Sequence, residues 1–104
     1  MKPKYYTLAE DGKTPIPTND LDEFADLYER GNERRVVGRN SRDGIVVSTV
    51  FLVIDHQFEN DGPPLLWETM VFGLEGDDEV QERYSSYEDA VAGHQRHVEQ
   101  YLGT

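Results

Sequence analysis

Residues 45–54 have the sequence Ile-Val-Val-Ser-Thr-Val-Phe-Leu-Val-Ile, the longest mostly apolar run in the chain. The run is rich in β-branched residues and lacks a strict alternation of apolar and polar side chains. Both properties are typical of a central strand that is covered on both sides at its later end. Ser48 and Thr49 mark the less buried start. We therefore expect an interior strand here, about half as long as a membrane span.

The segments on either side of this strand predict its neighbours. The Asp43-Gly44 step favours a tight hairpin turn that leads back to a strand over residues 34–40. On the other side, Gly62-Pro63-Pro64 breaks the chain before a strand over residues 65–72. A single connecting loop makes an antiparallel pair the simplest topology for residues 45–54 and 65–72.

Two helices are signalled by caps and apolar spacing. The first begins at Asp20, with Glu23 as its capping-box partner, and ends before Gly31. Its expected apolar face consists of Leu21, Phe24, Ala25 and Tyr28. The second is capped by Ser86, with Asp89 at the third helical position, and runs to Gly103. Its expected apolar stripe consists of Val91, His94, Val98 and either Tyr101 or Leu102.

Shorter strands are predicted at Tyr5–Leu8, around Pro15-Ile16-Pro17 and at Val80–Tyr84. The order β-α-β-β-β-(β)-α predicts one α+β domain over residues 1–104. It would hold an antiparallel sheet of four to five strands with both helices on one face. We expect Phe24, Tyr28, Val91 and Val98 to pack against that sheet.

Composition excludes several classes of protein. With 104 residues the chain suits one domain, and the absence of cysteine rules out disulfides and thiolate zinc sites. The formal charge of −11 opposes binding to phosphate backbones, so we expect no direct nucleic-acid contact. The first residues lack the apolar stretch of a signal peptide, and no run is long enough to span a membrane. We expect a cytoplasmic protein without membrane contact.

The charges are unevenly distributed along the chain. Five arginines crowd one short segment, whereas no lysine or arginine occurs over residues 43–82. This pattern predicts two groups of residues that bind a partner. They are the acids Asp77, Asp78 and Glu79, and the arginines Arg34, Arg35 and Arg39.

One constellation could carry chemistry. Asp55 and His56 follow the central strand, Glu59 and Asp61 lie in the loop, and Glu68 lies on the returning strand. If Ile54 pairs with Trp67, then Asp55 and Glu68 share a face of the sheet and lie diagonally. Such a group could hold a divalent ion or act as an acid and a base. Loops after buried strands also contain Asp and His simply because these residues form turns, so this explanation stays open.

The final helix offers a second spacing that suits a metal. His94 and His97 lie three residues apart, which allows chelation, but their place on the apolar stripe favours buried packing. No glycine-rich phosphate loop, cysteine nucleophile or Gly-x-Ser-x-Gly elbow is present. The order of the elements resembles a double-stranded RNA-binding domain, but acids stand at the start of the last helix where that class needs cations. We predict no cofactor and no firm metal site.

A family resemblance rests on three stretches of the chain. They are Ser48-Thr49-Val50-Phe51-Leu52, then Asp55-His56 with Phe58, then Gly62-Pro63-Pro64-Leu65-Leu66-Trp67-Glu68-Thr69-Met70-Val71-Phe72-Gly73. They resemble a family of small uncharacterised proteins of tailed bacteriophages and prophages. The chain departs from that pattern at Val53-Ile54 and in Glu59-Asn60-Asp61. The resemblance implies a phage or prophage accessory protein in a host bacterial cell, and implies no activity.

Two functions from different classes follow. The first is a non-enzymatic protein whose acidic surface binds a basic surface on a host protein. The second is a small metal-dependent or acid–base enzyme that uses Asp55, His56 and Glu68. The charge would also serve solubility alone. The strand edges at Tyr5–Leu8 and Val36-Val37 lead us to expect a homodimer.

Overall fold

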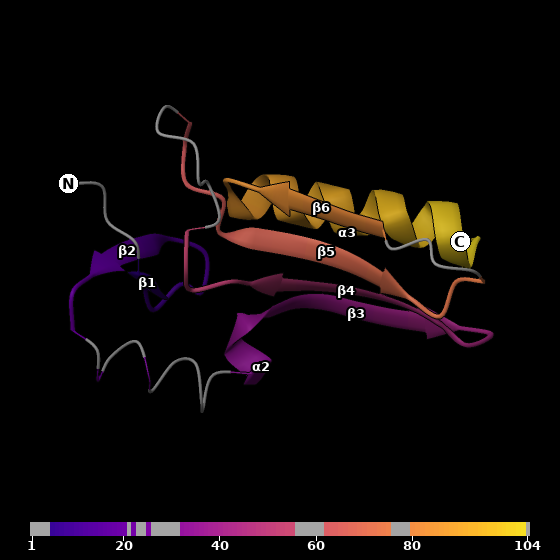
Figure 1. The fold of residues 1–104 in the computed structure, drawn as a ribbon, viewed down its shortest axis with the longest axis horizontal. Coiled ribbons are helices and arrows are strands. Elements are labelled where there is room, and N and C mark those ends of the chain that lie inside the picture. Colours follow the sequence, from indigo (N-terminus) through magenta and orange to yellow (C-terminus); the bar gives the residue numbers. More distant parts are fainter. Residues whose placement is uncertain are drawn as a thin grey trace.

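The computed structural model describes residues 5–20, 22, 25, 32–55, 62–75 and 80–103. The fold is α+β, as predicted. It contains a four-stranded antiparallel sheet, a separate two-stranded sheet and a long C-terminal helix (Figure 1). The prediction of a single sheet is therefore wrong.

The larger sheet is a meander in chain order. It consists of β3 (Val36–Arg42), β4 (Ile45–Phe51), β5 (Trp67–Phe72) and β6 (Val80–Tyr84). The predicted interior position of β4 and its antiparallel pairing with β5 are both confirmed. The turn between β3 and β4 has φ of 53° at Asp43 and 84° at Gly44, the left-handed values that a two-residue Asp-Gly hairpin needs.

The central strand ends sooner than its apolar run predicts. β4 stops at Phe51, and Val53 takes a φ of 61°, which turns the chain out of the sheet. Phe51 therefore faces Trp67, and Val50 faces Glu68. The pairing of Ile54 with Trp67, on which the Asp55–Glu68 site depended, does not form.

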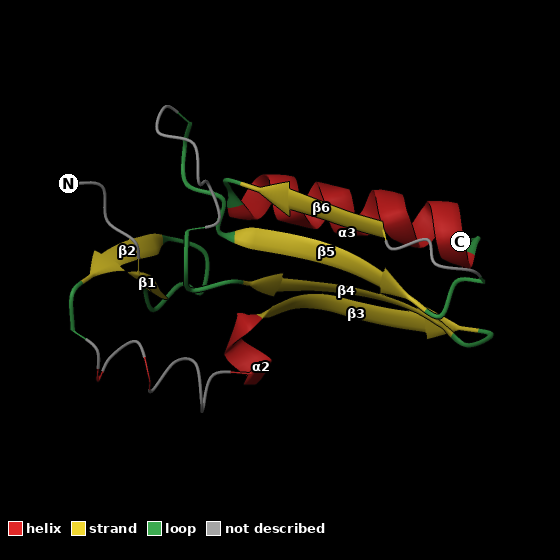
Figure 2. Ribbon diagram, in the orientation of Figure 1, coloured by secondary structure: helices red, strands yellow, loops and turns green. Residues whose placement is uncertain are grey.

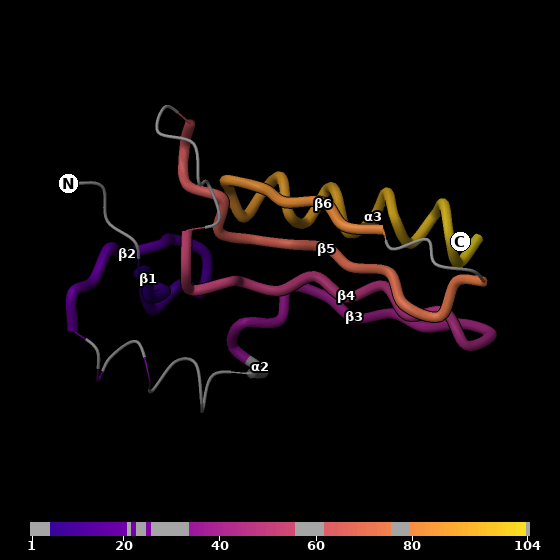
Figure 3. The backbone as a smooth tube through the Cα atoms, viewed as in Figure 1, coloured from indigo at the N-terminus to yellow at the C-terminus, as the bar shows by residue number. Residues whose placement is uncertain are grey.

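The N-terminal strands β1 (Tyr5–Leu8) and β2 (Pro15–Thr18) form a sheet of their own, in which no other strand of the described residues takes part. Two residues of β2, Pro15 and Pro17, lack the N–H that a further strand would need. The pair attaches to the end of β4, where the Tyr6 amide donates to the Val53 carbonyl oxygen at 2.8 Å. Figure 3 shows β1 and β2 beside the chain that leaves β4.

The expected helix after Asp20 falls mostly outside the described residues, as do Phe24, Tyr28 and Gly31. Where a strand was expected from residue 34, the chain instead forms the short helix α2 (Asn32–Arg35), and β3 begins at Val36. Arginine is a good helix former, whereas valine favours strands, so the boundary lies where the composition changes.

The C-terminal helix α3 (Tyr87–Leu102) confirms both predicted ends. The Ser86 side chain accepts from the Asp89 amide, and Gly103 is left-handed with a φ of 75°. α3 contacts all four strands and covers one face of the sheet (Figure 2). Within the described residues, no helix combines the length and apolar character that crossing a bilayer requires.

The buried face of α3 differs from the expected stripe. Val98 is buried as predicted, but Val91 is 44% exposed. The face instead consists of Ala90, Gly93, His94, His97, Val98 and Leu102. Position 93 of this face requires glycine, because a Cβ on Gly93 would overlap the ring of Tyr84.

Among the described residues, the core consists of two apolar clusters. The larger includes Phe51 and Trp67, which are fully buried and whose ring centroids are 5.2 Å apart. The smaller joins Val47 and Val71 of the sheet to Val98 and Leu102 of α3. Trp67 thus lies at the centre of the packing, close to the junction with the N-terminal strands.

Candidate functional site

The predicted catalytic carboxylates are buried in separate hydrogen-bonding arrangements. Asp55 Oδ1 accepts from the Leu65 amide at 3.0 Å. Glu68 Oε2 accepts from Arg83 Nε at 2.9 Å and from Gln81 Nε2 at 2.8 Å. His56 lies outside the described residues. The register brings Glu68 opposite Val50, and the ladder ends before Asp55, so the two carboxylates are not cross-strand neighbours.

Two of the predicted binding arginines join parts of the chain. The Arg34 guanidinium donates to the Leu8 and Ala9 carbonyl oxygens at 3.2 and 2.8 Å. Arg35 Nε donates to the Phe51 carbonyl oxygen at 2.9 Å. Arg39 is exposed on β3. The predicted acids Asp77, Asp78 and Glu79 lie outside the described residues.

The histidines of α3 belong to buried hydrogen-bonding networks. His94 Nε2 lies 2.7 Å from Asn40 Oδ1, and its Nδ1 lies 2.7 Å from Thr49 Oγ1. Thr49 continues to Thr69 at 2.6 Å, and the Tyr84 hydroxyl lies 2.9 Å from Thr69 Oγ1. A chain of polar side chains therefore crosses the sheet beneath α3. Burial lowers the pKa of His94, with a smaller contribution from the His97 charge.

This chain of hydrogen-bonded polar side chains reaches the surface at β6. The Tyr84 hydroxyl donates to Glu82 Oε2 at 2.8 Å, and Arg96 donates to that oxygen at 2.6 Å. Burial raises the pKa of Tyr84 to about 12. His97 Nδ1 donates to the Gly93 carbonyl oxygen at 2.6 Å, which fits the packing role. Across the described part of the chain, no three His, Asp or Glu side chains gather in an arrangement that could hold a metal ion.

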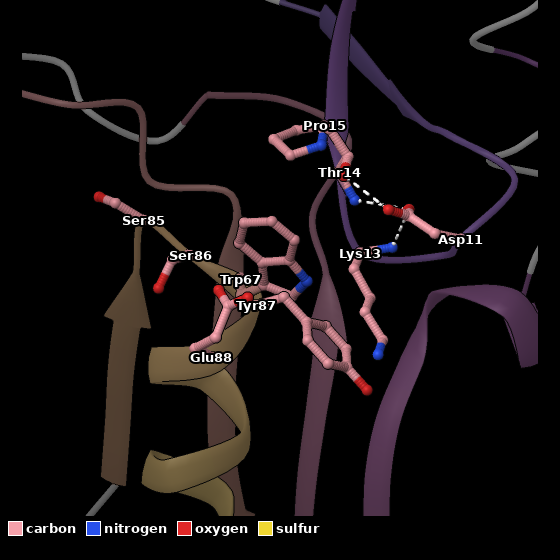
Figure 4. A pocket seen from close by; sticks show the side chains of 9 residues that line it. All are labelled: Asp11, Lys13, Thr14, Pro15, Trp67, Ser85, Ser86, Tyr87 and Glu88. Carbon is pink, nitrogen blue, oxygen red and sulfur yellow. Dashed lines mark hydrogen bonds between the residues drawn. The ribbon is translucent and has the colours of Figure 1, made fainter.

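A cavity of about 290 Å³ lies between the N-terminal hairpin and the start of α3. Figure 4 shows the turn after β1 on one side and the first residues of α3 on the other, with Trp67 between them. The lining residues are Asp11, Lys13, Thr14, Pro15, Trp67, Ser85, Ser86, Tyr87 and Glu88. This volume lies at the lower end of the range for small-molecule pockets.

The hairpin side of the pocket is held by a self-contained turn. The Asp11 carboxylate accepts from the Lys13 amide at 2.8 Å, from the Thr14 amide at 2.9 Å and from the Thr14 hydroxyl at 2.7 Å. The backbone bond from Lys13, followed by the bonds from Thr14, lowers the pKa of Asp11. The carboxylate of Asp11 is thus occupied within its own turn.

Two positive groups, the start of α3 and the Lys13 ammonium, border the pocket. Ser86 caps α3 by accepting from the Asp89 amide at 3.1 Å. The amides of Tyr87 and Glu88 belong to the first turn, whose N–H groups have no acceptor within the helix and carry the positive end of its dipole. Lys13 adds a cation, since its Nζ lies 5.5 Å from the centroid of the Tyr87 ring. Glu88 is the opposing charge on this side.

Trp67 provides a donor without an acceptor. The side chain is fully buried, yet Nε1 has no hydrogen-bond partner in the described part of the chain. An indole nitrogen can only donate, and a buried polar group without a partner is destabilising by about 1–3 kcal/mol. In Figure 4 the ring nitrogen lies on the edge of the indole that faces Lys13 and Tyr87.

Comparison with known proteins identifies no family for the chain. No protein-family model, no curated protein and no solved structure matches the chain.

The pocket was not predicted from the sequence. Trp67 packs in the core, but whether its N–H has a hydrogen-bond partner depends on which backbone lies beside the ring. Two local signals were present: the turn around Asp11-Gly12 and the Ser86 cap. The turn and the start of α3 come together over Trp67 because the N-terminal strands form a separate sheet, which was not predicted.

Proposed function

We propose that this protein is a small acidic accessory protein of the bacteriophage or prophage kind. It acts by binding a basic surface of a host protein and is not an enzyme. The phage setting rests on the sequence resemblance. The binding mode rests on one observation, which is how the chain uses its arginines.

Five arginines direct their guanidinium groups to acceptors inside the chain. Arg34, Arg35 and Arg42 donate to backbone carbonyl oxygens, and Arg83 and Arg96 donate to the carboxylates of Glu68 and Glu82. These bonds tie the guanidinium groups to acceptors of the chain itself, although Arg34, Arg42 and Arg96 remain exposed.

Acids outnumber the basic residues of the chain, and many of them lie on the surface. Exposed carboxylates among the described residues belong to Glu10, Asp11, Asp20, Asp22, Asp43, Glu75, Glu88, Asp89 and Glu99. With a formal charge of −11, the outward field of the protein is acidic. Such a field accelerates encounter with a positively charged partner and disfavours nucleic acid.

The acidic loop of the sequence begins at a defined end of the sheet. Gly73 lies against the turn between β3 and β4, where a Cβ would overlap the Gly44 carbonyl oxygen. Exposed Asp43 and Glu75 therefore belong to the same end of the fold. We propose that Asp77, Asp78 and Glu79, which follow Glu75 in the sequence, contact the partner.

The enzyme hypothesis has weaker support. Asp55 and Glu68 accept hydrogen bonds from Leu65 and Arg83 respectively, and these bonds hold the loop and the edge strand in place. Each carboxylate thus has a structural role that accounts for its burial.

The proposal is tested by capture of partners from a bacterial lysate, followed by measurement of association rates with the purified partner. We expect the rate to fall with added salt, because charges are screened over about 10 Å at 0.1 M salt. The triple variant Asp77→Asn, Asp78→Asn, Glu79→Gln should slow association. The matched control Glu10→Gln, Asp22→Asn, Glu99→Gln changes the net charge equally at other sites and should have a smaller effect. An association rate that neither salt nor the first variant alters would refute the proposal, as would the absence of any stoichiometric partner.

A further inference from the structure

We propose that the pocket between the N-terminal hairpin and α3 binds a carboxylate group. The indole N–H of Trp67, the ammonium group of Lys13 and the first-turn amides of α3 would be its donors. This inference is independent of the charge-driven docking proposed above. Either proposal can fail while the other stands.

The first argument is the unsatisfied donor. Trp67 is fully buried and its Nε1 has no acceptor among the described residues, although the ring is packed against Phe51. Since indole has no acceptor capacity, only a group with a lone pair can satisfy it. The required ligand must therefore present an acceptor atom to the pocket.

The second argument is the sign of the charge around that donor. The start of a sixteen-residue helix and the Lys13 ammonium both favour an anion. Three hydrogen bonds from its own turn hold the Asp11 carboxylate in place and lower its pKa, so Asp11 keeps a negative charge that opposes an anion. Glu88 is the other lining carboxylate, and its charge should also weaken binding.

The size of the cavity and the net charge of the protein favour a carboxylate over a phosphate. A cavity of about 290 Å³ suits a small molecule or one terminal residue of a peptide. A carboxylate carries a single charge and has two acceptor atoms, one for the indole and one for the lysine or helix amides. A phosphate dianion would meet twice the repulsion from Glu88 and from the overall charge of −11.

Entry requires a small rearrangement. Trp67 Nε1 is closed to solvent in the structure. Lys13 is exposed and lies over the Tyr87 ring, and its stem is flexible. We infer that Lys13 moves off Tyr87 when a ligand enters and then pairs with the bound carboxylate.

Trp67 is the only tryptophan, so one indole N–H signal in a ¹H–¹⁵N spectrum reports on the pocket. The probes are acetate, propionate, trialanine, trialanine amide and inorganic phosphate, all at constant ionic strength. We expect acetate, propionate and trialanine to shift the indole signal in a saturable way, and the amide to have no effect. Tighter binding of trialanine than of acetate or propionate would identify a peptide terminus as the source, whereas equal affinities would indicate a free small acid.

Exposed variants test the donors without risk to the core. Lys13→Met should weaken carboxylate binding about tenfold, the loss expected for one charge-assisted hydrogen bond. Its control, Arg39→Met, removes an equal charge from an exposed position of β3 and should not weaken carboxylate binding. Glu88→Gln should tighten binding, whereas Glu99→Gln on the same helix should leave it unchanged.

Three results would overturn the inference. They are an indole signal that no carboxylate shifts, equal binding of trialanine and its amide, and binding of phosphate in preference to carboxylates.

Discussion

The imidazole of His94 lies directly on the backbone of Gly38. A Cβ built on Gly38 would approach His94 Nε2 at 2.6 Å, closer than any stable contact allows. β3 can thus support the ring that links Asn40 to Thr49 only if residue 38 has no side chain. This contact explains a glycine inside a strand, where glycine is normally unfavourable.

Gly38→Ala should therefore destabilise the protein. The methyl group forces His94 aside and breaks its bonds to Asn40 and Thr49, which we expect to lower the free energy of unfolding by about 1–3 kcal/mol. Urea denaturation followed by circular dichroism measures the loss. Ser41→Ala, at an exposed position of the same strand, is the control and should have little effect. Equal stability of the two variants would contradict the packing described for His94.

Stability should fall in mild acid because of His94. Burial holds its pKa below the ordinary 6.5, so the folded state disfavours the charged ring. Below pH 6.5 the unfolded chain binds a proton that the folded chain resists, and the contribution of His94 is lost as pH falls. The difference in unfolding free energy between neutral and mildly acidic solution should shrink in His94→Gln. An NMR titration in which the His94 ring has a midpoint above 6.5 would reverse the sign and refute this prediction.

Phe51→Ala should have a large effect on the core. The ring is fully buried against Trp67, and removing such a side chain lowers the unfolding free energy by about 3–5 kcal/mol. Phe72 is 49% exposed on the neighbouring strand, so Phe72→Ala serves as the control and should be much milder. Thermal and urea melts of the two variants give the comparison. A melt left unchanged by Phe51→Ala would remove this ring from the core.

The arginine cluster should divide into structural and surface members. Arg35→Met removes the hydrogen bond to the Phe51 carbonyl oxygen and should lower the unfolding free energy by about 1–2 kcal/mol. Arg39→Met, at an exposed position, should stay within about 0.5 kcal/mol of the wild type. If Arg39→Met proved the more destabilising in denaturant titrations, the internal role assigned to the cluster would be wrong.

Assembly should involve the edge of the larger sheet. β3 is an edge strand, and edge strands pair with a second copy unless charges prevent it. We expect two copies to associate along β3, with Arg39 near their contact. Light scattering over a range of protein concentrations, at low and high salt, measures the mass. A monomer mass under all of these conditions would exclude the dimer.

Local signals in the sequence predicted local structure well. The Ser86 cap and Gly103 set both ends of α3, and the Asp43-Gly44 step set the hairpin, since each acts through its own backbone. The register of β4 and β5 was beyond reach, because it depends on the left-handed turn at Val53, which a β-branched residue rarely adopts.

The helix face and the pocket depended on tertiary contacts. Val91 was expected to be buried by its apolar character, but Gly93 and His94 contact the sheet because Tyr84 and Gly38 leave space of the right shape. The Trp67 pocket forms only where the hairpin turn meets the start of α3, two segments far apart in the sequence. No periodicity in the chain encodes that meeting.

The polar chain from Asn40 to Glu82 also makes the sheet intolerant of slippage. Thr49 faces Thr69 directly across β4 and β5, and their hydroxyls lie 2.6 Å apart. A shift of two residues would still place apolar side chains beneath α3, but it would bring Thr49 opposite Trp67 or Val71. The two hydroxyls would then lose their bond to each other, and the polar chain that runs from His94 to Tyr84 would be broken between them. The buried threonines thus specify the register of β4 and β5, which the apolar pattern alone does not.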